Sequence, residues 1–151
     1  MPKPAQRVTV IVNDPRWKGQ SRRVQAAAKA TLTHQSIPDA DVTIVLSDDE
    51  EVQQLNKAYR GFDKPTNVLS FENGESVEGR RQLGDIIIAF DTVERESRQQ
   101  EKPLATHLVH LVVHGVLHLL GHDHEDENEA EVMESHEIAI LGAMDIANPY
   151  D

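Results

Sequence analysis

The chain has 151 residues, of which 38% are hydrophobic and 27% charged, so its length and composition fit one folded domain and exclude a largely disordered chain. It contains no cysteine, which excludes disulfides and thiolate metal ligands. The net charge of −11 argues against a general nucleic-acid binder, although it does not exclude a local basic site.

No stretch of the sequence predicts a membrane span. The longest apolar stretch, residues 108–120, is interrupted by histidines and falls well short of the ~20 residues that a transmembrane helix needs. The N-terminus lacks the long apolar segment of a signal peptide. We therefore expect a cytoplasmic protein that has no membrane partner.

The first half of the chain predicts strands and helices in alternation. Residues 7–12, RVTVIV, are rich in β-branched side chains and predict a strand. Apolar residues recur at helical spacing over 21–35 and predict a helix. Residues 41–46 predict a second strand, and the acidic turn after it begins a helix over 48–59.

The second half predicts two strands followed by helices. The strands are expected at residues 67–71 and 85–90, joined by a polar, glycine-containing stretch over 73–84. Three helices follow, over residues 92–101, 104–120 and 127–141. This order predicts an α+β fold with a single domain over residues 1–151. Helices would cover a small mixed sheet of about four strands.

Charge is distributed unevenly along the chain. All 15 Lys and Arg residues precede position 103, and the segment 103–151 contains ten Asp and Glu residues and no basic residue. We interpret this segment as containing a solvated acidic helix. Any polyanion would then be bound by the first two-thirds of the chain.

The histidines near the end of the predicted helix 104–120 indicate a metal site. His114 and His118 are four residues apart, so they lie on one helix face and can reach the same cation. Gly121 can adopt the left-handed conformation that ends a helix, which lets His124 return as a third ligand. Three imidazoles leave a fourth position open, as in catalytic zinc sites.

Two neighbouring histidines leave alternatives open. His122 is the rival third ligand, and we rank it below His124 because it stays close to the helix end. His110 lies one turn before His114, where it can support the site, face a substrate or belong to the core. Three imidazoles also suit nickel, copper and iron, so the pattern does not identify the metal.

The spacing of the three histidines is also that of the metzincin proteases, H-E-x-x-H-x-x-G-x-x-H, with one change. Gly115 occupies the position of the glutamate that serves those enzymes as general base. A peptidase is therefore disfavoured unless another carboxylate substitutes. Asp123 and Glu125 are near in sequence, but no sequence argument positions either of them.

A second segment places two cations in a loop that leads into a predicted strand. Arg60 offers a planar fork of donors that suits phosphate, and Lys64 offers a compact charge. Taken alone, these residues favour a solvated loop over a phosphate site.

Together these segments resemble the YbeY family, bacterial endoribonucleases that act in ribosomal RNA maturation. The matching pieces are Tyr59-Arg60-Gly61, KPTNVLSF at residues 64–71, LGDI at 83–86 and H-G-x-L-H-L-x-G-x-D-H at 114–124. The chain departs from the family pattern at two positions. His122 replaces a common tyrosine, and Glu72 stands where proline is frequent.

The resemblance implies a function and a set of site residues. The metal ligands of the family fall on His114, His118 and His124, and its functionally important arginine falls on Arg60. The implied cofactor is one zinc ion. The implied activity is single-strand-specific cleavage of RNA, notably at the 3′ end of 16S ribosomal RNA, with a part in ribosome quality control. The implied partners are the small ribosomal subunit and ribosome-associated proteins.

A mechanism follows as a hypothesis. Zinc would polarise a water or a phosphate oxygen, and Arg60, together with Lys64, would stabilise the charge that grows on the phosphate. No general base is evident, and the nucleophile is either water or the RNA 2′-hydroxyl.

The main alternative to an enzyme is a metal-stabilised ribosome-assembly factor whose basic loop binds RNA. A metzincin-like peptidase is less favoured, because of Gly115. The net acidity weakens unaided RNA capture, since phosphate contacts supply much of such affinity. The acidic stretch 123–137 is therefore a candidate docking surface for a protein partner.

Overall fold

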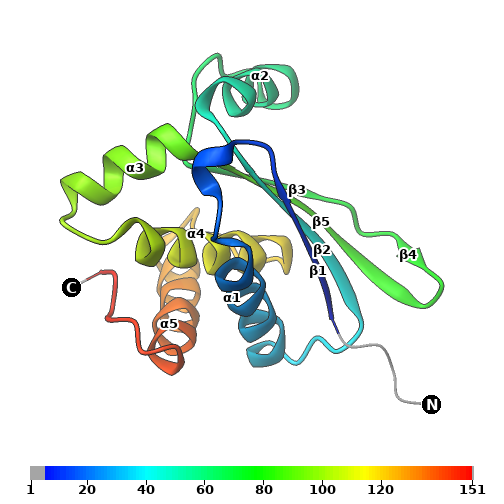
Figure 1. Ribbon diagram of the computed structural model, residues 1–151. Helices are drawn as coiled ribbons and strands as arrows, with labels where there is room; N and C mark the ends of the chain where they lie inside the picture. Colours follow the sequence, from blue (N-terminus) through cyan, green and yellow to red (C-terminus); the bar gives the residue numbers. More distant parts are fainter. Residues whose placement is uncertain (1–5, 151) are drawn as a thin grey trace.

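The computed structural model describes residues 6–150 and contains one five-stranded mixed sheet (Figure 1). The strand order is β1-β2-β5-β3, and β4 pairs with β5 alone. The first three strands in this order are parallel, whereas β3 and β4 run antiparallel to β5. The strands are β1 (Arg7–Val12), β2 (Ala40–Ser47), β3 (Val68–Glu72), β4 (Ser76–Val77) and β5 (Arg80–Ala89).

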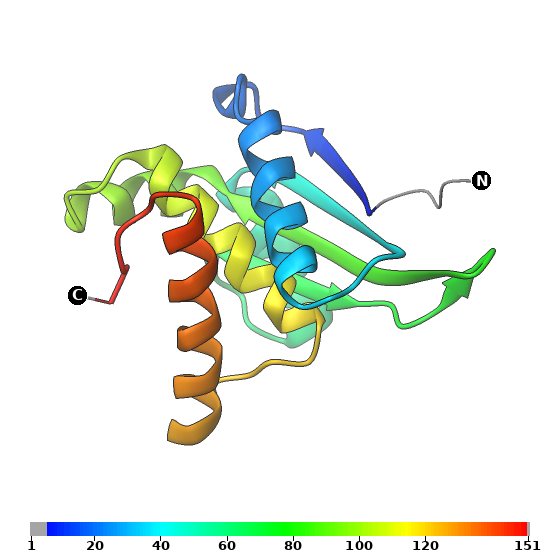
Figure 2. The same cartoon turned by 90° about the horizontal axis from the view of Figure 1, so that it is seen from below.

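Helices cover both faces of the sheet, in unequal number. α1 and α4 lie on one face, α5 packs against α4 on the side away from the sheet, and α2 lies on the opposite face (Figures 1 and 2). The helices are α1 (Ser21–His34), α2 (Asp49–Arg60), α3 (Phe90–Gln99), α4 (Leu104–Leu119) and α5 (Glu127–Ala143), with a short 3-10 turn at Pro15–Trp17.

The alternation of side chains along β5 explains why both faces are covered. Ile86 and Ile88 point into the main core beneath α1 and α4. Ile87 and Ala89 point to the other face, where they pack with Val52 of α2. A strand that is apolar on both faces must be covered on both faces.

Helix α4 lies unusually close to the sheet at Gly115. A Cβ atom at this position would stand 3.1 Å from Cδ1 of the buried Ile86 on β5. Glycine therefore lets the helix approach, and position 115 faces the core. His114 and His118 stay half-buried on a neighbouring side of the helix.

The predicted α+β class with its small mixed sheet is confirmed, and the predicted helices agree with the observed ones to within a few residues. The extent of the domain, 1–151, stays a prediction, since residues 1–5 and 151 lie outside the described part. Among residues 6–150, no helix has the length and apolar character needed to cross a bilayer.

The polar stretch over 73–84, expected only to join two strands, contains strand residues itself, and the sheet has five strands where about four were expected. Residues 76–77 form β4, and β5 already begins at Arg80. Arg80 is buried, and its Nε and Nη2 donate to Asp41 Oδ1 on β2 at 2.9 and 2.7 Å. Gln82 donates to the other oxygen of Asp41. These polar cross-strand partners hold a strand that hydrophobic periodicity does not reveal.

Candidate functional site

Three of the predicted site histidines line one small cavity beside β3. The cavity has a volume of about 170 Å³, and we call it the histidine cavity. His114 and His118 reach it from consecutive turns of α4 because they are four residues apart. Its lining residues are Arg60, Val68, Leu69, Ser70, His114, His118 and His124.

The end of α4 brings His124 back to this cavity. Gly121 has a φ of +99°, its N–H donates to the His118 carbonyl, and the next N–H donates to the Leu117 carbonyl, which together form a Schellman cap. The chain then reverses, and the His124 ring lies 5.6 Å from that of His114. Gly121 thus ends the helix as the sequence predicts.

His122, the rival ligand, lies elsewhere. Its Nε2 is 2.8 Å from Gln35 Oε1, and its ring stacks at a tilt on His136, with 4.9 Å between centroids. It is absent from the lining of the histidine cavity. Burial, together with the neighbouring His122 and His34, lowers the pKa of His136, so the His136 ring favours the neutral state.

The imidazoles of the histidine cavity are ligands of the type that divalent transition metals take, although in this structure their nitrogens do not all lie within 4.8 Å of one another. His114 Nδ1 is occupied by a carboxylate, that of Glu137, which leaves its Nε2 for a ligand. Within residues 6–150, His118 Nδ1 is buried without a hydrogen-bond partner, so no protein contact saturates this imidazole. Imidazoles of this kind are the ligands of zinc, nickel and copper.

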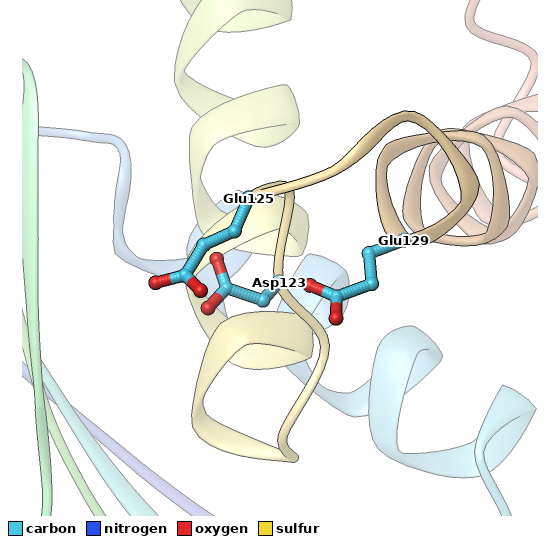
Figure 3. A group of neighbouring side chains, drawn as sticks. All are labelled: Asp123, Glu125 and Glu129. Carbon is cyan, nitrogen blue, oxygen red and sulfur yellow. The ribbon is translucent and has the colours of Figure 1, made fainter.

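A separate group of carboxylates lies where the turn after α4 meets the first turn of α5 (Figure 3). In the described part of the chain, only Asp123, Glu125 and Glu129 bring ligand-type atoms all within 4.8 Å of one another. The charge of Asp126, followed by burial and the charges of the other two, raises the pKa of Glu129. Carboxylates so placed can hold a cation, although exposed acidic groups are common without one.

The carboxylate that a metzincin would need is missing from the histidine cavity. Asp123 and Glu125 do not line it. Asp123 instead accepts a hydrogen bond from the backbone N–H of His124 at 2.7 Å. Position 115 faces Ile86 rather than the cavity, so a glutamate there would enter the core.

Glu137 of α5 is a buried carboxylate that the sequence did not single out. It is 1% exposed and accepts hydrogen bonds from His110 Nε2, from His114 Nδ1 at 3.3 Å and from the Tyr150 hydroxyl at 2.8 Å. Burial raises its pKa, but the hydrogen bonds from His110 and His114 outweigh burial and hold the pKa at about 2. An ionised carboxylate therefore contacts the Nδ1 side of the His114 ring.

The burial of Glu137 means that the predicted acidic helix is not solvated along its whole length. Glu137 falls on the buried stripe of α5, with Met133, Ile140 and Leu141. An acidic residue at helical spacing among apolar ones was the signal that could have revealed it. His110, whose role was open, is one of the groups that support this carboxylate.

Arg60 reaches the histidine cavity from α2, which lies on the opposite face of the sheet from α4. It is the last residue of α2, and its Nη2 donates to the Ser70 carbonyl of β3 at 2.7 Å. Lys64 does not line the histidine cavity. Its Nζ lies 5.6 Å from the centre of the Phe62 ring. The structure thus brings Arg60 to the three histidines and leaves Lys64 farther out.

A larger cleft adjoins the histidine cavity, and we call it the outer cleft. Its volume is about 600 Å³, and the two share Arg60, Ser70 and His118 as walls. The outer cleft is lined by Tyr59, Arg60, Phe62, Ser70, Phe71, Glu72 and His118. A ligand larger than a single phosphate can therefore extend from the histidines toward β3 and the end of α2.

Comparison with known proteins finds relatives over most of the chain. A family model described as Endoribonuclease YbeY matches residues 9–145. A protein named Endoribonuclease YbeY from Magnetococcus marinus is 51% identical over 121 residues, which cover 73% of this chain and 82% of that one. A protein of the same name from Rhodopseudomonas palustris is 47% identical over 138 residues, covering 85% and 70%.

A solved structure shares the fold. The solution structure of TM1509 from Thermotoga maritima aligns with a TM-score of 0.62 at 25% sequence identity, covering 95% of each chain. The mixed sheet with its covering helices is therefore an arrangement already observed in a solved protein.

Proposed function

The chain belongs to the YbeY endoribonuclease family, and from this premise we propose that it is a zinc-dependent, single-strand-specific endoribonuclease. Its work would be ribosomal RNA maturation at the 3′ end of 16S ribosomal RNA, together with ribosome quality control. Its partners would be the small ribosomal subunit and ribosome-associated proteins in the cytoplasm. The observation that carries the proposal is that Arg60 shares a cavity with three imidazoles.

The residues divide the work at this site. His114, His118 and His124 would hold one zinc ion, which when bound supplies Lewis-acid chemistry. Arg60 would bind the phosphate and stabilise the charge that grows on it, because its guanidinium is already fixed by the Ser70 carbonyl. Lys64, in the loop between α2 and β3, would add positive charge farther from the histidine cavity.

We assign Glu137 the part of a positioning residue. Its carboxylate fixes the Nδ1–H tautomer of His114 and so aims Nε2 into the cavity. We assign no general base, because Asp123 and Glu125 stand outside the cavity. The nucleophile would be water or the RNA 2′-hydroxyl.

The lack of a general base in the histidine cavity favours a second candidate function, that of a metal-stabilised ribosome-assembly factor that binds RNA without cutting it. A peptidase is disfavoured, because position 115 faces Ile86 and offers no room for a catalytic glutamate.

The test is cleavage of an oligonucleotide from the 3′ end of 16S ribosomal RNA, with zinc content measured in every sample. Zinc-loaded protein should cut, whereas chelator-stripped protein and His114→Ala should not. His122→Ala is the matched control and should keep both zinc and activity, because His122 contacts Gln35 instead.

Arg60→Ala separates binding of metal from catalysis. It should keep its zinc and lose about 10²–10³-fold in rate, as when one donor to a developing oxyanion is removed. Full activity in Arg60→Ala would contradict the role assigned to it. Zinc-loaded protein that cuts nothing would favour the assembly factor.

A further inference from the structure

Aromatic side chains are concentrated at the outer cleft. The chain has six Phe, Tyr and Trp residues in all. Trp17 and Phe90 are buried against each other in the core. Half of the six line the outer cleft, namely Tyr59, Phe62 and Phe71. Tyr59 is 72% exposed and Phe62 57% exposed, so these rings contribute little to the core.

Two cations lie beside these rings: Arg60, which lines the outer cleft, and Lys64, which does not. The guanidinium of Arg60 lies 5.5 Å from the centre of the Phe71 ring, and Lys64 Nζ lies 5.6 Å from that of Phe62. Tyr59 meets Phe71 edge-on at 5.6 Å. Aromatic rings close to positive charges are typical of sites that bind single-stranded nucleic acid. The bases stack on the rings, and the phosphates pair with the positive charges.

The loop that carries Phe62 is held in place before any ligand binds. Gly61 has a φ of +76°, and the Phe62 N–H donates to the Asn56 carbonyl at 3.3 Å. The buried Asn56 side chain donates to the Lys64 carbonyl at 2.9 Å. The backbone that carries Phe62 is therefore fixed in advance, which reduces the conformational entropy lost on binding.

From these observations we propose that the outer cleft is a stacking subsite for an unpaired base of the RNA, with Tyr59 and Phe62 as its platform. The proposal rests on the proposed endoribonuclease function. Arg60 lines both the outer cleft and the histidine cavity. The phosphate that Arg60 binds would therefore lie next to that base, at the mouth of the histidine cavity. A base in a duplex already has both faces covered by its neighbours, so the subsite selects single strands.

Stacking also suits the charge of the chain. With a net charge of −11, long-range attraction to RNA is weak. Stacking is short-ranged and far less dependent on salt than a phosphate contact. Exposed aromatic residues also occur at protein interfaces. The neighbouring cations and the adjoining histidine cavity favour RNA as the occupant.

The first test measures binding of zinc-loaded protein to a fluorescent, nuclease-resistant 2′-O-methyl phosphorothioate oligonucleotide. Tyr59→Ala and Phe62→Ala should each weaken binding at least about fivefold. Tyr59→Phe should bind normally, whereas Tyr59→Leu should fail like alanine, because it keeps apolar volume without a flat face. Ile11→Ala is the matched control, an exposed apolar residue on β1 at the opposite edge of the sheet.

Salt dependence distinguishes stacking from charge. Tyr59→Ala should lower affinity without changing the slope of log K against log salt. Lys64→Ala should reduce that slope by about 0.7 if it meets one phosphate of the single strand. A changed slope in Tyr59→Ala would count against stacking.

The second test asks whether the ring touches a base. Replacing one base after another by an abasic site should reveal a position where the abasic change and Tyr59→Ala together cost no more than either alone. Additive losses at every position would overturn the proposal. The proposal would also be overturned if Tyr59→Ala and Phe62→Ala both bound RNA with normal affinity. This holds even if the two variants lost binding to a purified ribosomal protein. If the unaltered protein binds no RNA, the proposed function itself fails.

Discussion

Glu137→Gln tests how much the histidine cavity depends on the buried carboxylate behind it. The change keeps the size of the side chain and removes its charge. A single amide oxygen then has to serve donors that two carboxylate oxygens now share, those of His110, His114 and Tyr150. Since Glu137 is 1% exposed, water has little access to take its place.

The expected magnitude concerns zinc affinity. Loss of a carboxylate that orients a ligating histidine typically costs 10–100-fold in metal affinity, or about 1.4–2.7 kcal/mol. The His114–Glu137 separation of 3.3 Å is at the long end for a hydrogen bond, so we expect a value near the lower limit, about tenfold. Competition with a chelator of known affinity at fixed pH measures it directly.

The matched control is Glu96→Gln. Glu96 Oε1 lies 2.8 Å from His107 Nε2, so it also pairs with a histidine of α4, but that histidine does not line the histidine cavity. Its removal should leave zinc affinity unchanged. Equal zinc affinities for Glu137→Gln and the unaltered protein, or equal losses in the two variants, would refute the positioning role.

The other predictions concern stability, measured by urea denaturation. Gly84→Ala should destabilise the fold by more than about 3 kcal/mol, because its Cβ would stand 2.0 Å from a β3 carbonyl oxygen at a φ of +136°. Gly142→Ala, with open space around it on α5, should instead stabilise by up to about 1 kcal/mol. Gly115→Glu should abolish folding or cost at least about 3 kcal/mol, since it forces a charge into the core, and a stable variant would contradict the packing described. The hydrogen bond from Arg80 lowers the pKa of Asp41 below its ordinary 3.8. The stability that ionised Asp41 contributes is therefore present above pH 3.8 and is lost as the pH falls through the pKa of Asp41 in the folded protein. Asp41→Asn should therefore make the free energy of unfolding depend less on pH on the acid side.

Local pattern predicted most of the elements and the His114–His118 pair. Both depend on spacing along one helix, which 3.6-residue periodicity determines. Gly121 was predictable for the same reason, because the cap of a helix is a local structure. The ranking of His124 above His122 was also a local argument. The structure places His124 at the cavity and His122 against Gln35.

The parts that sequence reasoning missed depend on contacts between distant segments. The polar start of β5 is held by the Arg80–Asp41 pair, 39 residues apart in sequence. Glu137 becomes part of the site only when α5 packs on α4. Neither hydrophobic periodicity nor motif spacing contains this information, because both examine one segment at a time.

The aromatic cleft illustrates the same limit. Tyr59 lay within a recognised motif, yet nothing in the sequence placed its ring beside Phe71. Phe62 is an ordinary loop residue until Asn56 fixes the backbone around it. The pairing of β3 with β5 and the position of α2 bring these rings together.

The C-terminal segment has a practical consequence for anyone who purifies this protein. The Tyr150 hydroxyl donates to Glu137, its ring meets His110 edge-on, and Lys102 donates to the Pro149 carbonyl. A purification tag or fluorescent fusion attached after residue 151 would begin next to the Tyr150–Glu137 hydrogen bond, and Glu137 in turn contacts His114. The same addition at the other end joins the chain before β1, at the far edge of the sheet. For the proposed metal site, we therefore expect the N-terminally tagged form to retain more metal than the C-terminally tagged form.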